Sequence, residues 1–558
     1  MLIYKFSFNK RIVAILGFIC LSCNILVFAQ KTKEDINTDW YHLSFDIDSV
    51  FGIGTTQTYQ YIAKKKYKPQ REIIVAVIDG GVDIDHEDLK ANIWLNKKER
   101  LNGKDDDRNG YVDDLHGWNF LGKTGDTLVL EKVGTEAFRE YKRLRPVYED
   151  MEKQQITLLT GKEKEEYDYF LNVRKKAGIG SYLYYSSYLQ AIAESFRAID
   201  SLLVHTHGNK EFVLSDLASL HPTDSIYSQY LEVVTNSTFM YDSLTPWKKT
   251  YDYHIANFEL AKNRVQSLDD ISSPRDSLVG DDITNIDDRF YGNPIINTYA
   301  YHGTVVSGII GAVRGNGLGI DGIAGHVKIM PIRAIPDGDE YDKDVALAIR
   351  YAVDNGANII NMSFGKDFSP HEEWVKDAIQ YASERNVLLV QASGNTGRDI
   401  DSLVSYPTGY MKDGKKPGGY IKVGATKADG ELYSLSNYGK REVDLFAPGV
   451  NIYALDADNG YDFVDGGTSL AAPMVSGAAA LIWSYFPGLT ASQLKDIIVS
   501  TVTKRENERV ELPGQKQKGK NVLFSDLSAS GGILNTYNAF LKADIIYNKK
   551  TNIFRRNK

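Results

Sequence analysis

The chain contains very little cysteine. Only two of its 558 residues are cysteines, Cys20 and Cys23, and both lie in an apolar N-terminal stretch. The remaining residues therefore cannot form a disulfide, which excludes the disulfide-dense scaffolds of small secreted domains. No His-Glu-x-x-His string occurs, which argues against a zinc hydrolase built on that motif.

An excess of positive charge is also lacking. The chain has 65 Lys and Arg against 73 Asp and Glu, which gives a net charge of −8 and an isoelectric point near 5.8. This balance argues against nucleic acid and anionic membrane surfaces as partners. An apolar content of 43% over this length is sufficient for a large packed core.

The N-terminus resembles an export signal. Basic residues near the start precede a mostly apolar run over 12–28, which predicts a signal peptide over 1–29. A lipoprotein signal ending before Cys23 is the alternative, and a single-pass anchor is a third interpretation because the run is at the lower length limit of a span. We expect an extracytoplasmic monomer, secreted or periplasmic, or a lipoprotein anchored at Cys23. Membrane contact would then occur only through a lipid or signal anchor.

One string near the C-terminus has the composition of a nucleophile loop. The run 467–474 reads Gly-Thr-Ser-Leu-Ala-Ala-Pro-Met, with Ser469 among small residues. Since proline is tolerated in the first turn of a helix, Pro473 predicts a helix over about 474–485 with Ser469 in the preceding loop. Such a serine would lie close to the positive end of a helix. Taken alone, the string is also typical of an ordinary turn before a core helix.

Two upstream strings supply a matching acid and base. The apolar run 73–78 predicts a buried parallel strand, and Asp79 follows it at the edge where open α/β sheets carry their sites. His302 precedes a predicted helix over 303–313 that is rich in small residues. In isolation, Asp79 could be a turn residue and His302 a capping residue. Together with Ser469 they provide an orienter, a general base and a nucleophile.

The order Asp79, His302, Ser469 and the residues around them resemble the subtilisin-like (S8) serine peptidases, of a Bacteroidetes-type with a long helical insertion between the Asp and the His. The resemblance covers about 40–120 and 280–545. It implies that these residues form a catalytic triad and that Asn395 donates to the oxyanion. One departure is visible, because the family usually has Ser or Thr directly after the Asp and this chain has Gly80. We expect this change to tune activity rather than abolish it.

The resemblance also implies where substrate binds. Two segments match the walls of the pocket for the residue before the scissile bond; they are Ser363, Phe364 and Gly365, and Ala392, Ser393 and Gly394. Small residues that expose the backbone allow a peptide to lie there as an added strand. We expect large apolar or aromatic side chains to fit, since neither wall motif carries an acid. Asp337, Asp339, Glu340 and Asp342 could favour a basic residue at an outer subsite, but a solvated turn is the favoured interpretation.

An acidic loop predicts a calcium site. Acidic and amide side chains alternate over 105–113 around Gly110, as in loops that bind Ca²⁺. The spacing is not that of an EF-hand, because His116 stands where the bidentate Glu would be needed. The family resemblance implies a structural calcium here, and a plain acidic loop is the alternative. The expected ligands are Asp105, Asp107, Asn109, Tyr111 and Asp113.

The organisation of the chain is unusual between Asp79 and His302. The intervening region contains an extra segment, about 125–274, with helical patterning over 136–154, 182–203 and 251–267. We predict a helical insertion that packs on itself. Its tyrosines at 182, 184, 185 and 188 are interpreted as a packing face. The insertion is hypothesised to cover part of the substrate cleft, and a conventional pro-domain is not expected.

The predicted fold class is α/β, with a three-layer α/β/α, doubly wound, mostly parallel sheet and an inserted helical subdomain. The peptidase domain is assigned to 40–545 and a C-terminal tail to 546–558. The predicted function is that of a serine endopeptidase, secreted or envelope-associated, which acts on protein or peptide substrates without nucleic acid. The alternative is a catalytically weak relative that binds partners through its insertion.

Overall fold

A computed structural model describes residues 37–556 except 209–210, 240, 267–273 and 515–520. The predicted signal peptide over 1–29, with Cys20 and Cys23, lies outside the described residues. The chain divides into two units, Met1–Trp40 and Tyr41–Lys558, and the elements below belong to the second. No helix within the described ranges is long and apolar enough to cross a membrane.

A mostly parallel sheet forms the centre of the second unit. In spatial order its strands, among the described residues, are β12 (Thr503–Lys504), β15 (Gly532–Ile533), β9 (Leu445–Pro448), β8 (Tyr420–Thr426), β7 (Leu388–Ala392), β6 (Ile359–Met362), β1 (Ile73–Asp79), β4 (Val327–Arg333) and β2 (Trp118–Asn119). Adjacent strands run parallel except β12 and β15. The central strands β1, β6, β7 and β8 are rich in apolar residues and almost entirely buried, as expected for a parallel sheet covered on both faces. The predicted fold class is confirmed.

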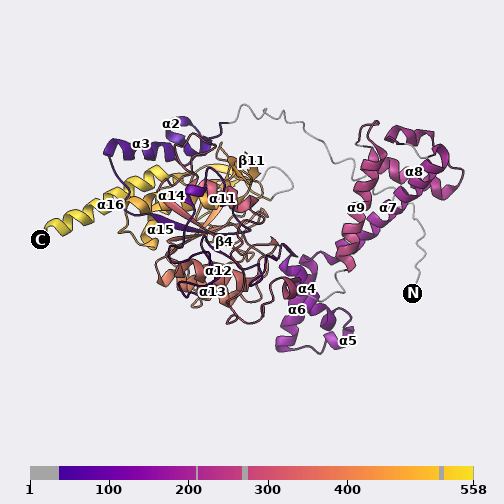
Figure 1. Ribbon diagram of the computed structural model, residues 1–558, viewed down its shortest axis with the longest axis horizontal. Helices are drawn as coiled ribbons and strands as arrows, with labels where there is room; N and C mark the ends of the chain where they lie inside the picture. Colours follow the sequence, from indigo (N-terminus) through magenta and orange to yellow (C-terminus); the bar gives the residue numbers. More distant parts are fainter. Residues whose placement is uncertain (1–36, 209–210, 240, 267–273, 515–520, 557–558) are drawn as a thin grey trace. The chain divides into compact units, whose positions relative to one another are not determined.

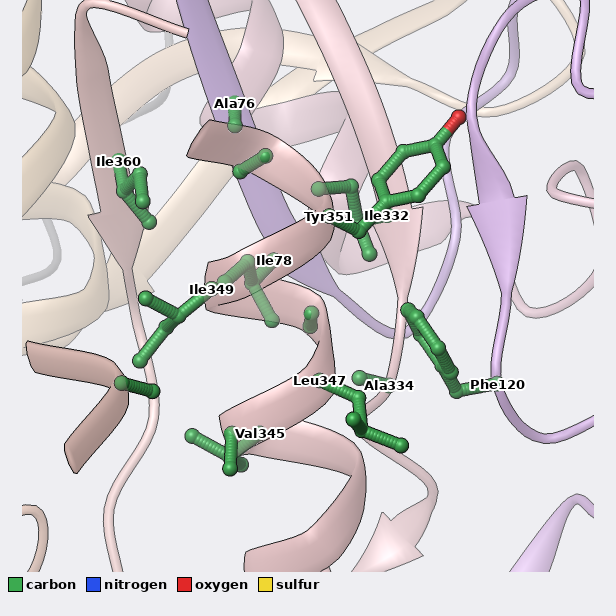
Figure 2. Close-up of a cluster of buried hydrophobic side chains, with 14 of the residues drawn as sticks. Ala76, Ile78, Phe120, Ile332, Ala334, Val345, Leu347, Ile349, Tyr351 and Ile360 are labelled. Carbon is green, nitrogen blue, oxygen red and sulfur yellow. The ribbon is translucent and has the colours of Figure 1, made fainter. Parts of the chain in front are cut away.

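Helices cover both faces of this sheet (Figure 1). α11 (Tyr301–Gly311) and α14 (Thr468–Tyr485) pack on each other and on one face, and α12 (Asp342–Asp354) and α13 (Glu372–Glu384) cover the other. Figure 2 shows Val345, Leu347 and Ile349 of α12 over Ile78 of β1 and Ile360 of β6. The buried cluster fixes the central strands, whose carboxyl ends carry the candidate site.

Terminal elements close the domain. α3 (Thr55–Lys65) packs against α16 (Thr536–Arg556), and the hydroxyls of Tyr61 and Tyr67 both donate to Asp544 of α16. The predicted tail over 546–558 therefore continues a helix as far as Arg556. α15 (Ala491–Ser500) begins with a capping box of Thr490 and Gln493. Two hairpin-like pairs complete the core, β10 (Val450–Asp456) with β11 (Gly460–Gly466) and β13 (Arg509–Glu511) with β14 (Asn521–Leu523).

The segment between β2 and α11 is largely helical. It contains β3 (Lys132–Gly134), α4 (Glu136–Tyr148), α5 (Lys153–Ile156), α6 (Gly161–Lys176), α7 (Ile179–His207), α8 (Ser225–Thr238), α9 (Trp247–Gln266) and α10 (Pro274–Leu278). One apolar cluster joins α4 and α6 to Phe368 of the core domain. A second cluster joins α7, α8 and α9. The insertion therefore has one part packed on the core domain and another with its own apolar core.

Of the tyrosines predicted to form a packing face on α7, Tyr184, Tyr185 and Tyr188 are exposed, and the side chain of Tyr182 lies outside the described residues. Tyr184 is 77% exposed, Tyr185 54% and Tyr188 45%, although Tyr185 and Tyr188 stack on each other. The buried contacts of α7 come from Leu189, Ile192 and Phe196 instead, which lie further along the helix. Leu189 and Ile192 are four and seven residues after Tyr185 and so lie on the same side of the helix, which means that position along α7, not its face, separates the exposed rings from the buried cluster.

Candidate active site

Asp79 and His302 meet at the carboxyl edge of the sheet. Asp79 ends β1, is buried and accepts a hydrogen bond from the Gly80 N–H at 2.7 Å. Since a carboxylate can only accept, His302 Nδ1 donates to both oxygens of Asp79, at 2.8 and 2.9 Å. Burial lowers the pKa of His302, but the charge of Asp79 and this hydrogen bond outweigh it, and the pKa is raised above its usual value. With the proton on Nδ1, the lone pair of Nε2 can accept a proton.

Glycines allow α11 to approach β1 this closely. A Cβ on Gly303 would lie 2.0 Å from the Gly81 carbonyl oxygen, which no side chain can tolerate. Gly81 itself has a φ of +141°, and a Cβ there would lie 2.1 Å from the Thr298 carbonyl oxygen. The small residues on both sides of the contact therefore bring His302 within reach of Asp79.

Ser469 lies in the first turn of α14, not in the loop predicted before it. The helix begins at Thr468, and Pro473 lies inside it. Groups from other segments stabilise this early start: Asn395 Oδ1 accepts from the Thr468 N–H at 2.9 Å, and Thr468 Oγ1 accepts from the Gly394 N–H at 3.1 Å. The prediction from proline was wrong because these partners, which are distant in the sequence, satisfy the first turn.

Pro473 leaves the carbonyl of Ser469 without its helical partner. In an α-helix the N–H of residue 473 would donate to the oxygen of residue 469, and proline has no N–H. Ser363 Oγ donates to this oxygen instead, at 2.9 Å. Ser363 Oγ accepts from Asn361 Nδ2 at 2.9 Å, and Asn361 Oδ1 accepts from Ser476 Oγ at 2.8 Å. A buried chain of three side chains thus fixes the main chain of Ser469.

Asn395 and Ser469 face one point in space. The amide of Asn395 is oriented by its Oδ1, which accepts from both the N–H and the hydroxyl of Thr468. A Cβ built on Gly467 would lie 3.0 Å from Ser469 Oγ and 3.3 Å from Asn395 Nδ2. The space that the absent Gly467 side chain leaves is therefore bordered by a hydroxyl and an amide donor. That arrangement suits attack on a carbonyl carbon and stabilisation of its oxygen.

The two predicted wall segments follow β6 and β7. Ser363, Phe364 and Gly365 leave β6, and Ala392, Ser393 and Gly394 end or follow β7. A Cβ on Gly365 would lie 3.0 Å from the Tyr406 carbonyl oxygen, 3.8 Å from Ser405 Oγ and 4.0 Å from Gln391 Nε2. Sequence reasoning gave these three neighbours no role, since Ser405 and Tyr406 lie in a loop without a motif. They place polar atoms beside the wall.

The acidic loop brings together a set of carboxylates that includes one the sequence did not indicate. Ligand oxygens of Glu99, Asp105 and Asp107 lie within 4.8 Å of one another. Glu99 is buried, and its Oε2 has no hydrogen-bond partner among the described residues. Glu99 falls outside the alternating motif, so no spacing rule identifies it.

The other predicted ligands support this loop. Asn109 Oδ1 accepts from the Tyr111 N–H at 2.8 Å, and the Tyr111 ring packs among buried aromatic residues. The Asp113 carboxylate accepts from the N–H groups of Asn102 and Gly103. Their side chains therefore shape the loop in this structure, and the three-carboxylate cluster is where a cation would be held.

The loop of four acids is not the solvated turn favoured above. Asp337 lies on the exposed β5 (Asp337–Gly338), whereas Glu340 and Asp342 are buried. Lys366 Nζ, also buried, lies 2.9 Å from Asp342 Oδ1 and donates to the Glu340 carbonyl oxygen at 2.7 Å. Burial raises the pKa of Glu340 to about 7, against the opposing charge of Lys366. The positive charge of Lys366 offsets part of the energetic cost of burying these acids. Because Lys366 is distant in the sequence, the local sequence does not indicate this partner.

Comparison with known proteins identifies the family of this chain. A family model described as the subtilase family matches residues 70–516. The chain is 37% identical over 204 residues to a thermophilic serine proteinase of Bacillus sp. (strain AK1), which covers 36% of this chain and 47% of that protein. It is 34% identical over 204 residues to subtilisin DY of Bacillus licheniformis, which covers 36% of this chain and 70% of that protein.

A solved protease structure from Pseudoalteromonas arctica aligns with a TM-score of 0.35 and 26% identity, over 43% of this chain and 70% of that chain. The match spans about half the length of the thermophilic proteinase. Because the family model matches most of the sequence, including Asp79, His302 and Ser469, the chain belongs to the subtilase family.

Proposed function

We propose that this protein is a serine endopeptidase whose triad is Asp79, His302 and Ser469, with Asn395 in the oxyanion hole. The observation that carries the proposal is the shared space above Gly467, where Ser469 Oγ and Asn395 Nδ2 lie 3.0 and 3.3 Å from one point. The bond of His302 to Asp79 supports it, since it fixes the tautomer in which Nε2 can take a proton.

The chemistry follows from these positions. His302 Nε2 takes the proton of Ser469 Oγ while Oγ attacks the peptide carbonyl carbon. Asp79 stabilises the imidazolium, and Asn395 Nδ2 donates to the developing oxyanion. The imidazolium then protonates the leaving amine, and water attacks the acyl-enzyme by the same route in reverse. Asn395 would supply roughly 2.7–4 kcal/mol of transition-state stabilisation, a figure that was measured on subtilisin.

The acidic loop is proposed to hold a structural Ca²⁺. Glu99, Asp105 and Asp107 would be its carboxylate ligands, because hard oxygen donors suit this ion and Glu99 carries a buried oxygen without a partner. Asn109, Tyr111 and Asp113 would complete or shape the loop. The ion would neutralise carboxylates that otherwise repel one another.

The cellular setting follows from sequence alone. We propose export, with a secreted or periplasmic form or a lipoprotein anchored at Cys23, and protein or peptide substrates. The assignment of the helical insertion to a Bacteroidetes-type depends on its length and position and stays a prediction. The alternative, a catalytically weak binding protein, gains little support because a binding protein would not need an oriented His302 or a donor at Asn395.

A fluorophosphonate probe tests the proposal. The purified protein would be labelled in the presence and absence of Ca²⁺, followed by peptide mapping. Labelling of Ser469 that disappears in His302→Ala is the expected result, because the probe reacts with a serine that a base activates. A folded, calcium-loaded protein that is not labelled would contradict the proposal. Hydrolysis of casein by wild type and not by Ser469→Ala would extend the result to peptide bonds.

A further inference from the structure

Two main-chain segments leave the sheet on either side of Asp79. β1 lies between β4 and β6, so the segments 334–340 and 363–366 emerge from the carboxyl edge as its two neighbours. The first begins at the Asp79 main chain, whose oxygen accepts from the Ile335 N–H. The second begins at Ser469, whose oxygen accepts from Ser363 Oγ. At the far end Lys366 Nζ joins them by donating to the Glu340 carbonyl oxygen at 2.7 Å.

These two segments therefore flank the end of β1 that carries Asp79 and are joined again at Lys366. A peptide held in an extended conformation beside a strand-like segment gains main-chain hydrogen bonds from it. In the segment 334–340, the alternate residues Asp337 and Asp339 direct their N–H groups to the same side.

Main-chain groups of the segment 337–340 are already hydrogen-bonded to the insertion. β3 pairs with β5 in a parallel sense, and the N–H groups of Asp337 and Asp339 donate to the carbonyl oxygens of Glu131 at 2.7 Å and Gly134 at 3.0 Å. Arg139 of α4 donates to the carbonyl oxygens of Asp339 at 2.8 Å and Glu340 at 3.2 Å. Both main-chain groups of Asp339 are thereby occupied from within the chain.

Buried charges fix the insertion in this position. Lys366, the residue after the wall glycine Gly365, donates to Glu136 Oε2 at 2.7 Å, and both side chains are more than nine-tenths buried. Glu136 also pairs with Arg139, and its N–H donates to Asp339 Oδ2 at 2.8 Å. Next along the chain, Asp367 pairs with Lys176 of α6, and Phe368 lies in the apolar cluster of α4 and α6.

The close approach also depends on glycine. Gly338 has a φ of +131°, and a Cβ there would lie 2.5 Å from the Gly134 carbonyl oxygen. The contact is therefore built into both partners and is not an incidental touch between surface loops. At its other end β3 reaches the catalytic side, where Tyr299, three residues before His302, donates its hydroxyl to Glu131 Oε2 at 2.9 Å.

We propose that β3 and α4 are a specificity-determining element that competes with the substrate backbone for the segment 337–340. This inference rests on the proposed function. While the insertion is docked, substrate is held chiefly by the residues next to the scissile bond, along 363–365. When the insertion is undocked, longer extended substrates gain main-chain partners at Asp337 and Asp339. The docked insertion thus restricts the enzyme to substrates whose binding does not depend on outer subsites.

The test is the double variant Glu136→Gln/Arg139→Gln, which alters only the insertion side of the contact. We expect kcat/KM for a peptide with several residues before the scissile bond to rise about tenfold, since two or more main-chain hydrogen bonds become available. A single-residue ester substrate should show no change. The matched control is Glu140→Gln/Arg143→Gln, a neighbouring pair on α4 with Arg143 half exposed, and it should leave both values unchanged.

Hydrogen exchange and fluorophosphonate labelling distinguish the possible outcomes of this test. Hydrogen exchange on wild type should show protected amides at Asp337 and Asp339, and faster exchange in the double variant; unprotected amides in wild type would overturn the inference. Equal changes for long and short substrates, or none, would overturn it too. Fluorophosphonate labelling of Ser469 separates the two levels: loss of labelling in wild type refutes the proposed function, whereas normal labelling with unchanged substrate-length preference refutes only the role of β3 and α4.

Discussion

The hydroxyl of Ser363 is expected to stabilise the nucleophile through its main chain. Ser363→Ala removes the bond to the Ser469 carbonyl oxygen and the acceptor of Asn361 Nδ2. Each such bond contributes roughly 1 kcal/mol net, and each buried group left without a partner adds to the cost. We therefore expect the free energy of unfolding to fall by about 2–3 kcal/mol, measured by urea unfolding.

The kinetic effect should exceed what a change in stability alone explains. The Ser469 carbonyl is part of the first turn of α14, so its release lets Oγ move relative to His302. A displacement on the order of 1 Å costs roughly a hundredfold in rate, and we expect kcat to fall by about 10–100-fold with KM little changed. Ser476→Ala is the control, because Ser476 lies at the other end of the same chain of side chains and does not contact Ser469. It should lower stability and leave kcat close to wild type.

Pro473→Ala provides the test that could refute this reasoning. The alanine restores an N–H that can donate to the carbonyl oxygen of residue 469. In wild type the hydroxyl of Ser363 donates to this oxygen instead. When Ser363 is present, the acceptor of the new N–H is already bonded. Pro473→Ala should then lower the free energy of unfolding by about 0.4–1 kcal/mol, because the unfolded chain gains flexibility. In the Ser363→Ala background the same change should recover both stability and kcat, with a coupling energy of about 1 kcal/mol in the double-mutant cycle. Strictly additive effects of the two substitutions would show that Ser363 does not replace the missing helical donor.

Three other outcomes follow from the charges. Because the pKa of His302 is raised and the base must be neutral, kcat/KM should fall as pH drops through a value above 6.5, and a pH profile with its acid limb below 6.5 would be inconsistent with the Asp79 contact. Since the folded-state pKa of Glu340, about 7, exceeds the unfolded value of 4.5, its protonated form stabilises the fold below pH 4.5 and this contribution is lost as pH rises to about 7. Glu340→Gln should therefore reduce the change in the free energy of unfolding over this pH range by at most roughly 3 kcal/mol. An unchanged pH dependence of the free energy of unfolding would contradict the burial of this acid. Chelation should lower the melting temperature of wild type and not of Glu99→Gln, whereas a wild type indifferent to chelator would indicate a plain acidic loop.

Much of the sheet could be predicted because parallel strands carry their signal locally. The run at 73–78 is continuously apolar, since helices cover both sides of the strand, and the structure places β1 there. The runs at 327–333 and 420–424 are mostly apolar, although each contains at least one basic residue, and β4 and β8 lie there. The short strands β2, β12 and β15 were not predicted. Each has two residues, so its pairing depends on neighbours brought by the fold rather than on its own pattern.

The candidate site was predictable to a different extent for each residue. Asp79 and His302 stand at element ends that their own sequence defines, and the structure brings them together. The start of α14 was misplaced, because the groups that satisfy its first turn come from Gly394 and Asn395. A helix end stabilised by tertiary partners cannot be located from the residues of that helix alone.

The docking of the insertion could not be predicted from local sequence, and the reason is electrostatic. In a sequence, charged residues such as Glu136 and Lys366 indicate solvent exposure, since an unpaired buried charge is strongly unfavourable. Here the two are 230 positions apart and buried against each other, with Glu340 and Asp342 nearby. Removing one partner from such a pair typically costs several kcal/mol, so the pair determines where the insertion docks even if it adds little net stability. The same charges that made this region look solvated therefore hold it beside the wall that ends at Gly365, which is why the docked position of the insertion could not be inferred from its composition.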